Sequence, residues 1–159
     1  MFRKMRRFKQ ELNETECKKI LKNEVRGVLS VIGDDGYPYG LPIDYWYDEI
    51  ENRIYFHGAK EGHKLDAIKN VTKYLFAHTT KDTEKTANKP LYINSVIVFG
   101  KISIVNDNEK IIEICKNLCC KFTDDENYVA DELEKQETAY AASNLFPNTS
   151  AANLSKKVN

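Results

Sequence analysis

The sequence predicts a mainly β (α+β) protein in which one antiparallel barrel of about six strands is flanked by helices. Segments rich in β-branched and aromatic residues are short and separated by turn residues, which is typical of antiparallel strands. Few stretches show helical periodicity. Closing the sheet into a barrel would remove the exposed edges that these strands otherwise present. The length of 159 residues fits a single domain, residues 1–159.

The first expected element is a helix. Asn13 can cap it, Glu16 completes a capping box, and the apolar stripe ends near Asn23. The strands expected after it are residues 25–32, 37–47, 53–57, 71–79 and 91–105. Pro38 and Pro42 make the second of these an edge or bulged strand, because proline lacks a backbone N–H.

The connections between these strands hold the other expected helices. Residues 33–36 form a hairpin turn, residues 63–70 a short helix and residues 81–89 an exposed loop. The segment 91–105 is one long strand or two, with a break near Gly100. Another helix starts near Asn106 or Asn108, and residues 131–142 are expected to be helical. The expected buried face of the helix after residue 106 is Ile111, Cys115, Leu118 and Phe122.

Charge and cysteine content limit the partners and the cellular location that the sequence predicts. Lys and Arg number 24, as do Asp and Glu, so no net field indicates nucleic-acid or membrane partners. The basic start (Arg3, Lys4, Arg6, Arg7 and Lys9) is a targeting or nucleic-acid arm, or a solvated lead-in to the first helix. We favour the lead-in, because acidic residues follow it rather than the apolar run of a signal peptide. Cys115, Cys119 and Cys120 could bind a metal, since the first two would share a helix face. Because the histidines are far away and no C-x-x-C pair exists, we favour buried or half-buried thiols in a reducing cytoplasm.

A candidate phosphate site lies in residues 54–65. A strand ends, Gly58 and Gly62 bracket a loop, and a helix starts with His63 and Lys64. Helix starts offer free N–H groups, glycines let the backbone approach a ligand, and lysine adds charge. An ordinary strand-to-helix loop is the alternative.

A second candidate segment is the aromatic strand at residues 36–47. Tyr39, Tyr45 and Trp46 offer flat surfaces on which a ring could stack. The alternative is an aromatic edge strand that packs on the barrel or on a second subunit. The sequence has no dinucleotide-binding glycine motif, P-loop, nucleophile elbow or H-E-x-x-H zinc motif.

Taken in order, these segments resemble the nitroimidazole-reductase-like branch of the pyridoxamine-phosphate-oxidase-like family. The matching segments are residues 5–7, 10–12, 26–29, 35–42, 55–64 and 95–100, of which 55–64 is the most specific. The resemblance implies a split β-barrel that forms a homodimer with FMN at the subunit interface. It places the phosphate on residues 57–64, with Lys64 facing it.

The resemblance also implies individual site residues. His57 lies nearest the chemistry, or donates a hydrogen bond to the phosphate or to a carbonyl. The implied cofactor-binding residues are Pro42, Ile43, Asp44, Tyr45, His57, Gly58, Ala59, Gly62, His63, Lys64 and Ser95.

Two departures from the family qualify these implications. True pyridoxamine phosphate oxidases hold a second phosphate with arginines, some near the C-terminus, whereas no arginine follows Arg53 here. We therefore do not expect the oxidase reaction itself. The tail at 153–159 lacks the family's glycine, and residues 140–152 make a poor strand.

The function expected from these features is that of an FMN-dependent oxidoreductase. It would pass electrons from a nicotinamide or ferredoxin donor to a small acceptor such as a nitro compound or a quinone. One alternative is a split-barrel protein that binds or degrades haem, with His57, His63 and His78 as available ligands. Another is a flavin-binding carrier or sensor without turnover.

Overall fold

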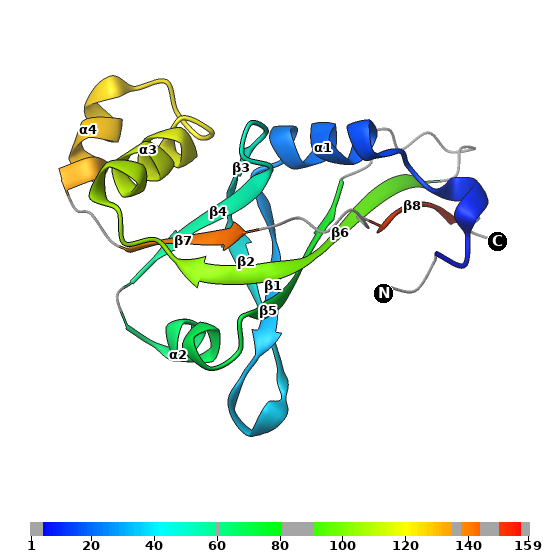
Figure 1. Ribbon diagram of the computed structural model, residues 1–159. Coiled ribbons are helices and arrows are strands. Elements are labelled where there is room, and N and C mark those ends of the chain that lie inside the picture. Colours follow the sequence, from blue (N-terminus) through cyan, green and yellow to red (C-terminus); the bar gives the residue numbers. More distant parts are fainter. Residues whose placement is uncertain (1–4, 60, 81–90, 135–137, 144–149, 157–159) are drawn as a thin grey trace.

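The strands of the computed structural model form one antiparallel sheet (Figure 1). The structure describes residues 5–59, 61–80, 91–134, 138–143 and 150–156. Its strands are β1 (Arg26–Ile32), β2 (Pro38–Asp44), β3 (Trp46–Asp48), β4 (Arg53–Gly58), β5 (Lys73–Thr79), β6 (Leu91–Ile104), β7 (Thr138–Ser143) and β8 (Ser150–Lys156). The sheet order is β2-β1-β5-β6-β7-β4-β3, and β8 pairs with β6 outside this path. Every pairing among these strands is antiparallel, as the sequence predicts.

The sheet curls into a split barrel because its two end strands are consecutive in the chain. β2 ends at Asp44 and β3 begins at Trp46, so only Tyr45 separates the two ends of the strand order. Since neighbouring Cα atoms are about 3.8 Å apart, these ends must meet in space. If β2 and β3 are counted as one bent strand, the barrel path has six strands. The predicted fold class is confirmed.

The core fills the space inside the curled sheet. Along β1, Leu29 and Val31 point inward and are buried, whereas Val28 and Ile32 are exposed. Ile54 and Phe56 of β4 contribute from the other side of the barrel. A Cβ on Gly27 would lie 2.2 Å from the Phe76 ring, so β1 can cross that ring only with glycine at this position.

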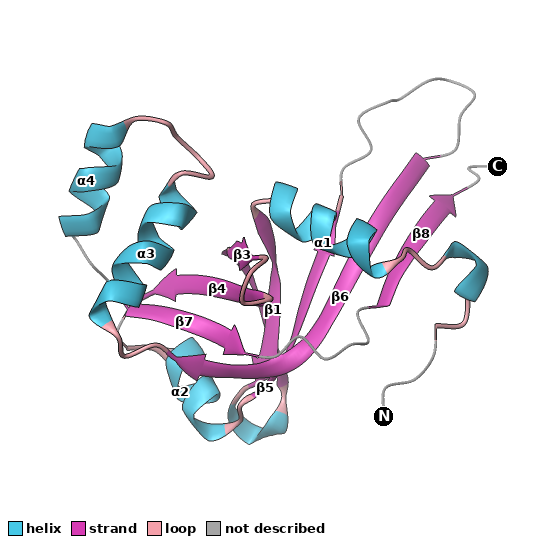
Figure 2. Ribbon diagram, turned by 45° about the horizontal axis from the view of Figure 1, so that its top comes forward, coloured by secondary structure: helices cyan, strands magenta, loops and turns pink. Residues whose placement is uncertain are grey.

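Helices cover the ends and flanks of the sheet (Figure 2). The helices are η1 (Phe8–Gln10), α1 (Glu14–Asn23), η2 (Asp34–Gly36), α2 (His63–Asn70), α3 (Asn108–Cys119) and α4 (Glu126–Glu134). The predicted capping box of α1 is present: Glu16 N–H donates to Asn13 Oδ1 at 2.9 Å, and Asn13 N–H to Glu16 Oε2 at 3.0 Å. No helix in the described part of the chain is long and apolar enough to cross a membrane.

An ion-pair cluster attaches α3 to the β3–β4 hairpin. Lys110 Nζ lies 2.6 Å from Glu51 Oε1 and 2.9 Å from Glu113 Oε2. Its ammonium also lies 5.2 Å from the centre of the Tyr55 ring, which stacks on Trp46. Side chains from a helix and a hairpin therefore fix one another here.

Three details of the predicted elements are wrong or are refined. Residues 138–142 are not helical: α4 ends at Glu134, and β7 pairs with both β4 and β6. Phe122 lies beyond α3 and is exposed, whereas Ile114, which the predicted face omits, is buried. The cap of α3 is Asp107, between the two expected asparagines.

Other predicted elements agree with the structure or fall outside it. β6 is one continuous strand through Gly100, and β7 and β8 occupy the region expected to make a poor strand. The loop predicted at 81–89 lies outside the described residues.

Candidate functional site

The start of α2 has no side-chain cap. Its N-cap residue is Gly62, which makes no side-chain hydrogen bond, and the N–H groups of Leu65 and Asp66 donate to the Gly62 carbonyl. Leu65 and Ile68 are buried in the core and hold the helix in place. Within the described residues, no side chain caps this helix start, which the core holds in place.

Gly62 leaves open space at this helix start. Its φ of +115° is a conformation that residues with side chains rarely adopt, and no described atom lies within 4 Å of a Cβ placed on it. Lys64 lies half-buried in the first turn. Gly58 ends β4 and Ala59 follows it, exposed, on the way to α2. The loop combines backbone donors, a lysine and room for close approach, which suits a phosphate group.

The ring of His63 is held against the tip of the β1–β2 hairpin. It stacks on Tyr39 with ring centres 4.3 Å apart and an interplanar angle of 25°. Its Nε2 lies 3.4 Å from Asp34 Oδ2. Sequence reasoning missed Asp34, because this contact joins a turn to a helix start almost thirty residues later. The two predicted segments, 36–47 and 54–65, thus meet at His63.

Three predicted cofactor-binding residues, Pro42, Ile43 and Asp44, end strand β2, and only Ile43 points inward. Ile43 is buried in the core, whereas Pro42 is exposed on the opposite face of β2. Asp44 pairs with Arg26 across the β1–β2 ladder, at 2.5 Å from Nε and 2.9 Å from Nη2. The hydrogen bond to Asp44, and after it the attraction between the two charges, raises the pKa of Arg26.

Tyr45 is enclosed where β2 passes into β3. Its side chain is 0% exposed, and its ring meets Phe76 edge-on at 4.7 Å. Its N–H donates to the Val25 carbonyl, and its own carbonyl accepts from Lys121 Nζ at 3.1 Å. The Lys121 ammonium lies 4.4 Å from the centre of the ring. Burial raises the pKa of the Tyr45 phenol.

His57 is exposed on β4, opposite Ala139 of β7. The β3–β4 ladder ends with the pair Trp46 and Tyr55, two residues before His57. β2 and β4 are in contact across the split of the barrel. The strand carrying Pro42 and Asp44 thereby lies beside the strand that leads to the α2 loop.

Ser95 lies three strands from β2 but on the same face of the sheet. Ile97 is opposite Ala77, Ala77 opposite Val28, and Val28 opposite Pro42. Because cross-strand partners and alternate residues point the same way, Ser95 and Pro42 share the outer face. The predicted residues therefore fall into three groups: the α2 start with His57, the outer face with Pro42, Asp44 and Ser95, and the buried pair Ile43 and Tyr45.

The sequence profile of the pyridoxamine 5'-phosphate oxidase family matches residues 13–152. The chain belongs to this family. The match spans the whole barrel path and every predicted site residue, whereas Arg6 and Arg7 precede it. No curated protein sequence matches the chain.

Solved structures from the same fold share little sequence with the chain. A candidate 5-nitroimidazole antibiotic resistance protein from Bacteroides thetaiotaomicron is 13% identical, with a TM-score of 0.73 over 89% of this chain and 84% of that one. An FAD-binding protein from Mesorhizobium loti is 16% identical, with a TM-score of 0.66 over 91% and 97%. A flavocytochrome from Azotobacter vinelandii is 18% identical, with a TM-score of 0.74 over 96% and 73%. At these identities the likeness establishes the split-barrel fold.

Metal-binding side chains do not gather in the part of the chain that the structure describes. No group of three or more His, Cys, Asp or Glu side chains among the described residues could hold a metal ion. All four cysteines are free thiols. The cavity formed by residues 6–10 lies elsewhere and includes none of the predicted site residues. The uncapped start of α2 is therefore the family member's best candidate for binding an anionic ligand.

Proposed function

We propose that this family member binds FMN and uses it as an oxidoreductase to reduce a small acceptor, such as a nitroaromatic compound or a quinone. The observation that carries the proposal is the start of α2, where Gly62 offers no side-chain cap and no described atom lies within 4 Å of a Cβ placed on it. The FAD-binding and nitroimidazole-resistance proteins that share the fold support a flavin as the ligand.

The chain's own residues divide the binding of FMN between them. The first-turn N–H groups of α2 and Lys64 hold the phosphate, and Gly62 lets the backbone approach it. His63 is held by Asp34 and Tyr39, which position this helix start against the hairpin. Pro42, on the outer sheet face, contacts the ring, and Ser95 lies three strands away on the same face. Ile43 and Tyr45 point into the core and support the strand from behind.

The bound flavin supplies the electron transfer. His57 is the exposed ionisable side chain at the end of β4, and we assign it the delivery of a proton to the reduced acceptor. A nicotinamide or ferredoxin donor supplies the electrons. We place the protein in the cytoplasm, where its four free thiols would stay reduced.

A second copy of the chain covers the outer sheet face in this proposal. The cross-strand rows on that face are Pro42, Val28, Ala77 and Ile97, and Gly40, Ser30, Leu75 and Phe99. Val28 is 40% and Ile32 39% exposed, so an apolar face with few charges lies open. Val28→Glu is expected to convert a dimer into a monomer in light scattering, whereas Ile112→Glu, an equally exposed residue on α3, is not.

The test of the proposal is a visible absorbance spectrum of the purified protein before and after addition of FMN. Bound flavin is expected to give a spectrum shifted from that of free FMN. A nicotinamide donor is expected to bleach this spectrum, and a nitro acceptor added afterwards to restore it. Absence of flavin uptake would contradict the proposal. A Soret band on haem titration would then support the haem alternative. Bound FMN that no donor reduces would favour the carrier or sensor.

A further inference from the structure

A cavity of about 340 Å³ lies at the N-terminal turn, away from α2. It is lined by Arg6, Arg7, Phe8, Lys9 and Gln10. The turn is held by its own backbone, since Gln10 N–H donates to the Arg7 carbonyl at 2.9 Å. Helix η1 contacts β8, which pairs with β6 from Leu91 to Ile97. This volume lies in the usual range for small-molecule sites, about 300–1,000 Å³.

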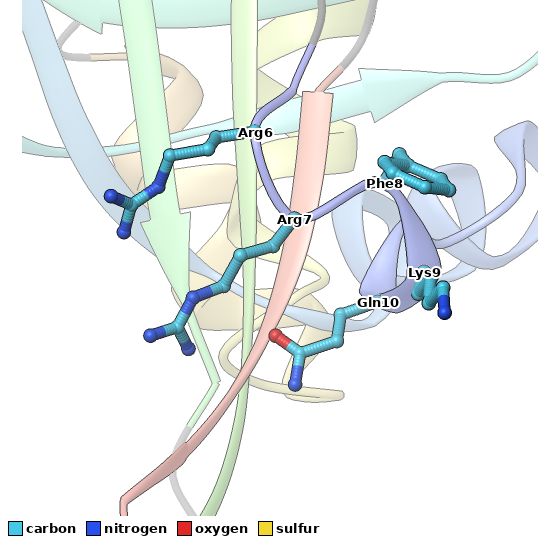
Figure 3. A pocket seen from close by; sticks show the side chains of 5 residues that line it. All are labelled: Arg6, Arg7, Phe8, Lys9 and Gln10. Atoms are coloured by element: carbon cyan, nitrogen blue, oxygen red, sulfur yellow. The ribbon is translucent and has the colours of Figure 1, made fainter.

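Two guanidinium groups point to the same side of this turn. Figure 3 shows the side chains of Arg6 and Arg7 leaving consecutive backbone positions in nearly the same direction. Arg7 has φ −96° and ψ 54°, which departs from the extended backbone in which neighbours point apart. Two planar forks side by side match the oxygens of a phosphate or diphosphate.

These cations lack counter-charges within the described residues. No acidic side chain among the described residues forms an ion pair with Arg6, Arg7 or Lys9. On α1, by contrast, Lys18 pairs with Glu14 and Lys22 with Glu49. Three positive charges therefore surround the cavity without internal neutralisation. An anion that entered would meet donors that need not first break an ion pair.

Gln10 adds an independent sign of a missing ligand. Its Oε1 is buried and has no hydrogen-bond partner among the described residues. The other end of the amide, Nε2, is a donor. In Figure 3 this amide group is turned to the same side of the turn as Arg7. A buried acceptor without a donor is unfavourable by about 1–3 kcal/mol, so a ligand hydroxyl or a water is expected to fill it.

From these observations we propose that Arg6, Arg7, Lys9 and Gln10 form a second anion site, which binds the phosphate or diphosphate group of a small molecule. The site is separate from the α2 loop of the same chain. β8 and η1 lie beside the first half of β6, whereas α2 meets the tip of the β1–β2 hairpin. Figures 1 and 2 both show η1 and α2 far apart.

A small phosphate ligand fits better than a nucleic acid. The chain has equal numbers of basic and acidic residues, and the unpaired cations gather in one cavity instead of a long stripe. Free pyrophosphate and the diphosphate of a nucleotide share the required chemistry.

The experiment is calorimetric titration of the full chain, equilibrated with FMN, with pyrophosphate and with ADP at low ionic strength. Both ligands are expected to bind, and the R6Q/R7Q double variant to weaken binding at least tenfold. The matched control is K18Q/K22Q, which removes the same charge from α1 and is expected to leave binding unchanged. If ADP binds more tightly than pyrophosphate, the natural ligand is a nucleotide. If the two affinities are equal, the site recognises the phosphates alone.

Three results would overturn the proposal: no binding of either ligand, an equal loss in K18Q/K22Q, or release of FMN as pyrophosphate binds. The last would place pyrophosphate at the α2 loop. R7K, which keeps the charge but loses the fork, provides a second variant should the double variant misfold. It is expected to weaken binding by severalfold, and unchanged affinity would contradict a guanidinium-specific site.

Discussion

The starts of α1, α2 and α3 differ in how their free N–H groups are satisfied. Asn13 closes α1 with a complete capping box, and Asp107 closes α3 by accepting from the N–H groups of Glu109 and Lys110. Gly62 begins α2 and offers no side chain. The first two helix starts have side-chain caps, whereas no side chain among the described residues caps the third, where we propose that the phosphate binds.

The contrast separates stability from binding. A helix start with its own side-chain cap gains stability and has fewer N–H groups left for an anion. The start of α2 has no such cap among the described residues, so it lacks that stabilisation. Substitutions at the capped starts should change the free energy of unfolding, and substitutions at the α2 start should change affinity for FMN.

The largest expected effect is on the affinity for FMN in Lys64→Ala. Loss of the charge at the α2 start should weaken binding by about 1.5–3 kcal/mol, roughly tenfold to a hundredfold. Fluorescence titration with FMN measures it. Lys69→Ala, in the last turn of the same helix, is the control and should bind like the wild type. Equal affinities of the two variants would move the phosphate away from α2.

Gly62→Ala should affect stability and binding together. Forcing a side chain into a φ of +115° should destabilise the fold by about 1–3 kcal/mol in chemical denaturation. Gly36→Ala is a matched control, because Gly36 also has positive φ and open space around it, but lies in the hairpin turn. If both variants lost FMN affinity equally, the special role of Gly62 would be refuted.

Asp107→Ala should affect stability alone. Removing this cap should lower the free energy of unfolding by about 0.5–2 kcal/mol and leave FMN affinity unchanged. Thermal unfolding and the FMN titration together check both halves. Asn13→Ala at α1 should behave in the same way, and weaker FMN binding in either variant would blur the distinction between the helix starts.

The last expected effect, a pH dependence, concerns Lys121, which ties the end of α1 to Tyr45 by donating to the carbonyls of Glu24 and Tyr45. Burial lowers the pKa of Lys121 to about 8, from an ordinary value of 10.5. Between these values the unfolded chain holds more protons than the folded one, so stability should rise with pH across that window. Urea unfolding of the wild type and Lys121→Met at pH 7.5 and 10 measures it. The wild type should gain relative to the variant at the higher pH, and a constant difference would contradict the lowered pKa.

Local signals in the sequence predicted most of the fold. Asn13 and Glu16 stand three residues apart and mark the start of α1 by themselves. Residues 138–142 carry no alternation of apolar and polar side chains, so the sequence favours a helix there. They become β7 because they fill the gap between β4 and β6, a constraint that acts only in the folded barrel.

The candidate site was predictable only in part. Gly62, His63 and Lys64 are consecutive, so the sequence places them together at a helix start. Their packing is a long-range matter: Asp34 and Tyr39 reach His63 from the β1–β2 hairpin. Nor does the sequence reveal that Tyr45 is buried rather than available on the surface, because its neighbours Lys121 and Phe76 come from distant segments.

The measurement that tests the phosphate role of α2 most directly compares the affinities of the wild-type protein for FMN and for riboflavin, which differ only in the phosphate. Binding through the uncapped helix start and Lys64 predicts at least tenfold tighter binding of FMN, a ratio that falls markedly in Lys64→Ala. Equal affinities for the two flavins would contradict the assignment of the phosphate to this helix start.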